Sequence, residues 1–228
     1  MDFTSTAVWA ALGSIILANI VLSGDNAVVI ALAARSLPAH QQVKAIFWGS
    51  AAAIVLRIAL TLLAVEMLKW PYLKIVGALL LLYIGITLLG EDDGSDGGHA
   101  HTGSLLVAIR TILVADLVMS LDNVLAVAAA AKGSVVLLVI GLAISIPLII
   151  FGSTLVIRLM ERFPFIVTLG AALLGFLAGE MVLTDPAVTA RFGELGHDVI
   201  NLAGAAGALL VVAVGTWLRR RQRAEASA

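Results

Sequence analysis

The chain contains no cysteine and few charged residues, and each shortage excludes a class of protein. Without cysteine there are no disulfides, no thiolate metal sites and no cysteine nucleophile. Charged residues make up 13% of the 228 positions, about half the share in a soluble domain, whereas 61% are hydrophobic. A water-soluble fold of this size could not bury so much apolar side chain, which excludes a cytosolic enzyme as a first interpretation. The net charge of -1 gives no basic footprint, so we expect no nucleic-acid partner.

Several catalytic motifs are missing as well. There is no Walker motif, so the chain does not encode ATP hydrolysis. The apolar segments contain neither a Ser–His pair nor a His-Glu-x-x-His helix, which argues against an intramembrane hydrolase. They contain no histidine at all, which argues against Zn²⁺ or Cu⁺ as a bound ion. We therefore expect a protein that is not an enzyme and holds no permanent cofactor.

Long apolar runs predict an all-α, polytopic membrane protein. A helix needs roughly 20 mostly apolar residues to cross a bilayer. Seven such spans are expected, at about 8–34, 43–66, 72–90, 104–131, 134–158, 164–183 and 199–218. The runs lack the period-2 alternation of a β-barrel.

One long connection interrupts the apolar segments. Residues 91–103 read EDDGSDGGHAHTG, a composition that is rich in glycine and acids and that predicts a solvated linker. Its His99 and His101 are the residues of this linker that could bind a metal ion.

The distribution of Lys and Arg predicts the orientation in the membrane. With seven spans, the side that holds the arginine-rich tail carries nine basic residues: Arg35, Lys44, Arg110, Arg158, Arg162, Arg219, Arg220, Arg221 and Arg223. The other side carries four, namely Lys69, Lys74, Lys132 and Arg191. Because basic residues accumulate on the cytoplasmic side, we predict a cytoplasmic C-terminus and an N-terminus outside.

The sequence also contains an internal repeat. Residues 18–34 (ANIVLSGDNAVVIALAA) align with residues 115–131 (ADLVMSLDNVLAVAAAA) at an offset of 97. The match resumes at an offset of 93, where residues 70–85 align with residues 163–178. The shared Ser-x-Asp-Asn is costly inside a membrane, so chance similarity of apolar helices is a poor explanation.

The repeat divides the chain into two copies of three spans. They cover about 8–90 and about 104–183, and a seventh helix follows at about 199–218. Because three is odd, the second copy enters the membrane from the opposite side and the repeat is inverted. In transporters with this layout the substrate site lies near the membrane midplane, between the copies.

Asp25 and Asp122 occupy equivalent positions within the two copies. A charge at the centre of a membrane helix costs about 2.5–3.5 kcal/mol, so each acid needs a partner, a proton or a bound cation. The sequence leaves one alternative to a bound cation open, in which these polar residues form hydrogen bonds that hold neighbouring helices together.

Oxygen donors accompany both acids, at positions i, i+4 and i+7 of each helix. These are Asn19, Ser23 and Asn26 in the first copy, and Asp116, Ser120 and Asn123 in the second. Hard divalent cations such as Mg²⁺, Ca²⁺ and Mn²⁺ prefer such ligands. The predicted metal ligands are Asp25, Asn26, Asp122, Asn123, Asp116 and Asn19, with Ser23, Ser120 and Glu180 as further candidates.

Arg57 and Glu180 are less easily interpreted. Arg57 lies within a span, where it is either a counter-ion to one of the acids or extends toward the membrane interface. Glu180 lies near the end of its span, so a structural role competes with a role in the site.

The segments SGDNAVVIALAARSLP and SLDNVLAVAAAA resemble the paired Asp-Asn motifs of the TerC family, and the resemblance covers nearly the whole chain. It implies a bacterial inner-membrane protein of the lysine-exporter superfamily, whose TerC members are linked to tellurium resistance and Mn²⁺ efflux. The motif residues are Asp25 and Asn26, with Asp122 and Asn123. One asymmetry stands out, because Asn19 is neutral where the second copy has an acid.

We therefore expect a secondary transporter that exports a divalent cation, Mn²⁺, which Asp25 and Asp122 bind directly. Its expected partners are the lipid bilayer and the cation, and self-association into a homo-oligomer is left open. Two alternatives remain at this point: an exporter of an amino acid or another small solute, and a membrane scaffold or stress protein that transports nothing.

Overall fold

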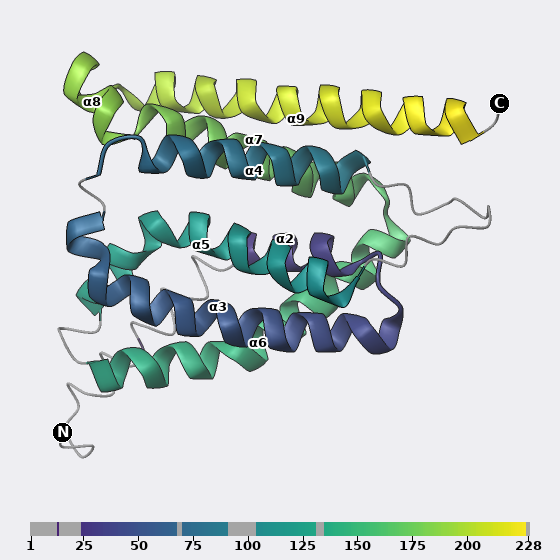
Figure 1. Cartoon of the computed structure of the whole chain (residues 1–228), viewed down its shortest axis with the longest axis horizontal. Coiled ribbons are helices and arrows are strands. Elements are labelled where there is room, and N and C mark those ends of the chain that lie inside the picture. Colours follow the sequence, from purple (N-terminus) through teal and green to yellow (C-terminus); the bar gives the residue numbers. More distant parts are fainter. Residues whose placement is uncertain (1–12, 14–23, 68–69, 91–103, 131–134, 227–228) are drawn as a thin grey trace.

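The computed structural model describes residues 13, 24–67, 70–90, 104–130 and 135–226, and all structural statements below concern these residues. Their regular structure is entirely helical (Figure 1). The helices are α2 (Gly24–Ala34), α3 (Ala39–Met67), α4 (Leu73–Gly90), α5 (Leu105–Ala130), α6 (Val135–Arg162), α7 (Phe165–Leu183), α8 (Pro186–Phe192) and α9 (His197–Ala226).

Five of these helices contain a stretch that is long and apolar enough to cross a membrane. The stretches are Ala39–Thr61, Leu73–Gly90, Val139–Arg162, Phe165–Leu183 and His197–Gln222. They correspond to five of the seven predicted spans. The predicted span at 104–131 forms helix α5, and the predicted span at 8–34 lies mostly outside the described residues. The count of seven spans therefore stays a prediction.

Several helices are longer than the apolar runs that predicted them. Helix α3 begins at Ala39, directly after Pro38, and α9 continues to Ala226 through the arginine-rich tail. An apolar run predicts the part of a helix that lies in the hydrocarbon core of the membrane. The hydrogen-bonded helix itself can continue into polar residues at either end.

The helices pack in two groups (Figure 1). Helices α4, α7 and α9 contact one another in one group, and α2, α3, α5 and α6 form the other. Contacts of α2 with α7 and of α4 with α5 join the groups. In the predicted repeat, α2 is equivalent to α5 and α3 is equivalent to α6. The contact of α3 with α5 is therefore the equivalent of the contact of α6 with α2, and both contacts are present. The inverted repeat itself stays a prediction.

Glycine residues allow α7 and α9 to approach each other closely. A Cβ atom placed on Gly175 would collide with the carbonyl oxygen of Gly207, and one placed on Gly207 would collide with that of Gly175. A Cβ atom on Gly179 would collide with the carbonyl oxygen of Ala203 in the same way. Such small residues are typical of contacts between membrane helices, where backbones pack without intervening side chains.

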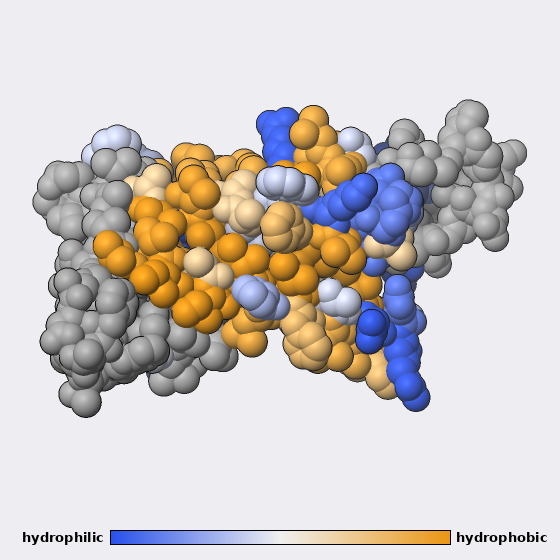
Figure 2. All heavy atoms as spheres, turned by 90° about the horizontal axis from the view of Figure 1, so that it is seen from below, coloured by the Kyte–Doolittle hydropathy of each residue, from blue (hydrophilic) through white to orange (hydrophobic). Residues whose placement is uncertain are grey.

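Large apolar side chains are exposed on several helices. They include Val55 on α3, Leu79 and Tyr83 on α4, Phe151 on α6 and Leu209 on α9. Figure 2 shows one face on which hydrophobic residues cover the middle and hydrophilic residues gather toward one end. A soluble protein rarely exposes an apolar surface of this extent, whereas a lipid-facing surface requires it.

Two contacts define one end of the helix bundle. The guanidinium of Arg35 donates a hydrogen bond to the carbonyl oxygen of Leu88 at 2.9 Å. At the last residue of α4, a Cβ atom placed on Gly90 would lie 3.7 Å from Cβ of Leu218, which directly precedes the arginine-rich tail. Arg35 and the arginine-rich tail therefore lie at the same end of the bundle, as the predicted distribution of basic residues requires.

Asp185 ties two helices together at the opposite end. It is buried and caps the N-terminus of α8, where its Oδ1 accepts from the N–H of Ala187 at 2.7 Å. The same oxygen accepts from the N–H of Tyr72 at 2.9 Å. Its Oδ2 accepts from the N–H groups of Lys74 at 3.0 Å and Ile75 at 3.3 Å. One carboxylate thus fixes the start of α4 against the start of α8.

The sequence analysis predicted no helix between the spans at 164–183 and 199–218, so it missed α8. The signal was the pair Asp185-Pro186, because aspartate is a preferred N-cap and proline is favoured at the first helical position. The carboxylate also stabilises an unfavourable backbone, since Tyr72 has a φ of 69° without being glycine.

Replacing Asp185 by alanine is expected to destabilise the protein by about 3 kcal/mol, because four backbone N–H groups lose their acceptor. The temperature of unfolding in detergent, followed by fluorescence-detected size-exclusion chromatography, measures the effect. Asp198→Ala is the matched control, since Asp198 is an exposed acid in the first turn of α9. Equal unfolding temperatures for the two variants would contradict the assigned role of Asp185.

Candidate functional site

A buried ion pair between Arg57 of α3 and Asp116 of α5 forms the centre of the polar site. The Nη2 atom of Arg57 donates to Oδ1 of Asp116. The arginine is 3% exposed and the aspartate 7% exposed. The sequence left two roles open for Arg57, and the structure shows that it is the counter-ion of Asp116.

Ser120 closes this ion pair into a ring of hydrogen bonds. Its hydroxyl accepts from Nε of Arg57 at 2.9 Å and donates to Oδ2 of Asp116 at 3.2 Å. Ser120 lies one turn after Asp116 on α5, in agreement with the i, i+4 spacing read from the sequence. On α3, the hydroxyl of Thr61 donates to the carbonyl oxygen of Arg57 at 2.7 Å. Each oxygen of Asp116 is therefore engaged by a protein donor.

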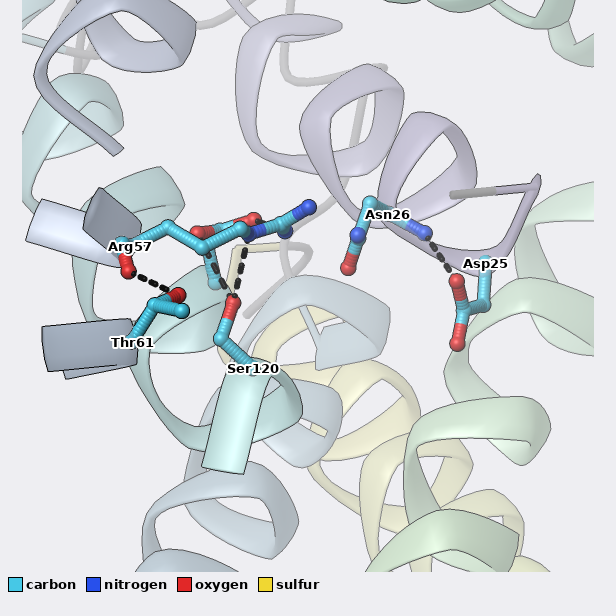
Figure 3. A network of polar contacts seen from close by, with 6 residues as sticks. Asp25, Asn26, Arg57, Thr61 and Ser120 are labelled. Carbon is cyan, nitrogen blue, oxygen red and sulfur yellow. Dashed lines mark hydrogen bonds and ion pairs between the residues drawn. The ribbon is translucent and has the colours of Figure 1, made fainter. Parts of the chain in front are cut away.

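Asn26 and Asp25 lie beside this ring, in the first turn of α2 as described (Figure 3). Asn26 is 2% exposed, and its side chain points toward the Arg57 network. Asp25 is half-buried and lies on the far side of Asn26 from that network, and one of its oxygens accepts from the N–H of Asn26 at 2.7 Å. No residue in the described part of the chain forms an ion pair with Asp25.

The structure brings together part of the predicted ligand set. Asp25, Asn26, Asp116 and Ser120 come from α2 and α5, which pack against each other. Glu180 is half-buried on α7, one turn before that helix ends, and α7 belongs to the other group of helices. Four predicted ligands fall outside the described side chains: Asn19, Ser23, Asp122 and Asn123. His99 and His101 fall outside the described residues as well.

No three acidic or histidine side chains gather into a metal-binding group within the described ranges. Since the side chain of Asp122 is not among those that the structure describes, the predicted metal site stays a prediction. The site could have been only partly found from the sequence, because the pairing of Arg57 with Asp116 depends on which faces of α3 and α5 meet.

Two further buried hydroxyls were missed by the sequence reasoning. Ser50 on α3 is 1% exposed and Ser153 on α6 is fully buried. Within the described part of the chain, neither hydroxyl oxygen has a hydrogen-bond partner. Gly152, next to Ser153, lies close to Ala27 of α2, two residues beyond Asp25. Serine is common in membrane helices, so the sequence alone gave no reason to select these two.

Beside the closed ring, the site offers oxygen ligands of two kinds: a carboxylate at Asp25 and an amide at Asn26. Hard cations prefer such ligands, and the apolar surroundings strengthen any charge interaction within them. A polar site of this kind inside a helical bundle with a lipid-facing surface defines a polytopic integral membrane protein.

The sequence matches the profile of the Integral membrane protein TerC family over residues 4–223. The chain therefore belongs to the TerC family. It is 44% identical over 178 residues to the membrane protein YjbE of Bacillus subtilis (strain 168), in an alignment that covers 78% of this chain and 81% of the relative. The resemblance read from the paired Asp-Asn motifs is thus confirmed.

More distant relatives are also membrane proteins by name. The chain is 27% identical to the membrane protein YceF of Bacillus subtilis (strain 168), over 98% of this chain and 90% of the relative. It is 26% identical to the inner membrane protein YgdQ of Escherichia coli (strain K12), over 79% of this chain and 83% of the relative. No solved structure matches the chain.

Proposed function

We propose that this protein is a secondary transporter that exports Mn²⁺ from the cytoplasm. Membership of the TerC family supports a transporter. The observation that carries the proposal is Asp25, a half-buried carboxylate in the bundle that forms no ion pair with any described residue. It lies next to Asn26, an amide that is almost wholly buried.

A bound cation offsets the cost of such a carboxylate. An ionised acid at the centre of a membrane helix costs about 2.5–3.5 kcal/mol, and a divalent cation at the carboxylate removes this penalty. In the proposal Asp25 and its sequence equivalent Asp122 bind Mn²⁺ directly. The other predicted ligands complete or orient the shell: Asn26, Asn123, Asn19 and Asp116, with Ser23, Ser120 and Glu180 as further donors. Exchange for protons or another counter-ion drives transport, and no permanent cofactor or enzymatic activity is part of the proposal.

The proposed architecture has seven spans arranged as two inverted copies and a seventh helix. The symmetric pairing of α3 with α5 and of α6 with α2 supports this arrangement. The ion site then lies between the copies, where α2 meets α5.

An amino-acid exporter would need a cationic group for the substrate carboxylate. Arg57, which lies within a predicted span, is the candidate for that role, and its guanidinium is already engaged by Asp116 and Ser120. A non-transporting scaffold would tolerate the loss of Asp25. Transport measurements distinguish both alternatives from the proposed function.

The test is the flux of radioactive Mn²⁺ in inside-out membrane vesicles, with Mg²⁺, Ca²⁺ and lysine as competitors. We expect saturable uptake that unlabelled Mn²⁺ reduces and lysine does not. Reduction by lysine would identify the amino-acid exporter. Vesicles that take up no more Mn²⁺ than vesicles lacking the protein would refute the proposal.

Reporter fusions are expected to place the 91–103 linker and the arginine-rich tail in the cytoplasm, with Lys132 outside. The reason is the excess of basic residues at the end of the bundle where Arg35 and Leu218 lie. Fusions at Gly103, Lys132 and Ala228, read by alkaline phosphatase and green fluorescent protein, measure the topology. A linker on the outside while the tail stays in the cytoplasm would contradict the inverted repeat, and all three sites reversed would contradict the orientation alone.

A further inference from the structure

The ion pair between Arg57 and Asp116 is saturated by hydrogen bonds. Arg57 donates to Oδ1 of the carboxylate, and Ser120 donates to Oδ2 while it accepts from Nε of the arginine. All three side chains are buried. Buried pairs with this degree of satisfaction are stable as units, because removing either partner leaves an uncompensated charge in an apolar surrounding.

A closed pair has two consequences for a cation that binds nearby. Neither oxygen of Asp116 is left without a protein donor, so this carboxylate is a weaker ligand than its sequence position suggests. In addition, the positive charge of Arg57 cancels the negative charge of Asp116. The charge left for a cation then comes from Asp25 and, in the proposed function, from Asp122.

We propose that Arg57 is a specificity-determining residue, which sets the net negative charge of the cation site by neutralising Asp116. This inference rests on the proposed function and extends it to the selection of ion charge. A divalent cation matches the two negative charges that Asp25 and, in the proposed function, Asp122 supply. Three would favour a trivalent cation and would hold a divalent cation too tightly for release.

The proposal predicts an order of affinities that follows charge. Arg57→Gln adds one negative charge to the site relative to the wild type, and Asp116→Asn removes one. The double variant restores the wild-type charge, although it lacks both members of the pair. Coulomb interactions over a few ångström in a partly buried site change the dissociation constant by at least about tenfold for each unit of charge.

The experiment measures Mn²⁺ binding to purified protein in nanodiscs by electron paramagnetic resonance, with Tb³⁺ as the competing trivalent ion. We expect Arg57→Gln to bind Mn²⁺ at least about tenfold more tightly and to raise the preference for Tb³⁺. Asp116→Asn should bind Mn²⁺ at least about tenfold more weakly, and the double variant should return to within about threefold of the wild type. Thr61→Val is the matched control, since it removes a buried hydroxyl bonded to Arg57 without changing any charge.

A purely structural role for Arg57 makes a different prediction. The double variant would then bind Mn²⁺ no better than Asp116→Asn, which would overturn the proposal. This comparison holds even if Arg57→Gln alone does not accumulate, because it needs only the other two variants. If the wild type binds Mn²⁺ and the affinities do not follow charge, only this inference fails. A wild type that binds no Mn²⁺ would refute the proposed function and this inference with it.

Discussion

Replacing Asp25 by asparagine is expected to abolish Mn²⁺ transport while the protein still inserts into the membrane. Asparagine keeps the size of the side chain and one oxygen ligand, but it carries no charge. A hard divalent cation therefore loses a large part of its electrostatic stabilisation. Insertion should not suffer, because a buried carboxylate is costly and its removal lowers that cost. Efflux of radioactive Mn²⁺ from cells, at matched membrane content of each variant, measures the effect.

Asp122→Asn is expected to have the same effect, because the repeat makes Asp122 the equivalent of Asp25. Asp116→Asn should cause a milder loss, since Asp116 is bonded to Arg57 and Ser120 and contributes less to the shell. Asp198→Asn serves as a control, because this acid is exposed in the first turn of α9. Normal efflux by both the Asp25 and the Asp122 variants would eliminate the metal site.

Replacing Gly207 by valine is expected to have the largest effect on stability. A Cβ atom at this position collides with the carbonyl oxygen of Gly175 and lies 3.2 Å from the backbone nitrogen of Gly179. Because the obstacle is backbone, rotation of a side chain cannot relieve it, and α7 and α9 must move apart. We expect a loss of about 3 kcal/mol or more, which corresponds to a fall of about 10 °C in the unfolding temperature in detergent.

Ala205→Val is the control for this prediction. Ala205 lies two residues before Gly207 on the same helix, and its side chain is exposed. The control adds a comparable volume to α9 without touching α7, so its unfolding temperature should stay near that of the wild type. A Gly207→Val variant as stable as Ala205→Val would show that α7 and α9 do not pack through their glycines.

The helices were predictable because membrane spans impose a simple condition on sequence. About 20 apolar residues must follow one another, and five such runs reappear within helices, although α3 and α9 extend beyond the expected spans. This condition does not predict short helices that do not cross the membrane. The seven-residue helix α8 was therefore not predicted, although the Asp185-Pro186 pair marks its start.

The candidate site was predictable to the extent that it depends on single helices. Asp116 and Ser120 lie one turn apart, and their hydrogen bond follows from that spacing. The contact of Arg57 with Asp116 joins two residues that are 59 positions apart in the chain and lie on different helices. Such a contact depends on how α3 and α5 rotate against each other, which the apolar pattern of a membrane helix does not encode. For the same reason, the burial of the Ser50 and Ser153 hydroxyls could not be predicted from the sequence.

The most direct test of the central claim measures the entry of Mn²⁺ into liposomes. The liposomes contain the purified protein as their only protein and enclose a dye whose fluorescence Mn²⁺ quenches. The wild type is expected to quench the dye at a saturable rate, whereas Asp25→Asn, reconstituted at equal density, should match liposomes without protein. A wild type no faster than protein-free liposomes, or an Asp25→Asn variant as fast as the wild type, would contradict the account.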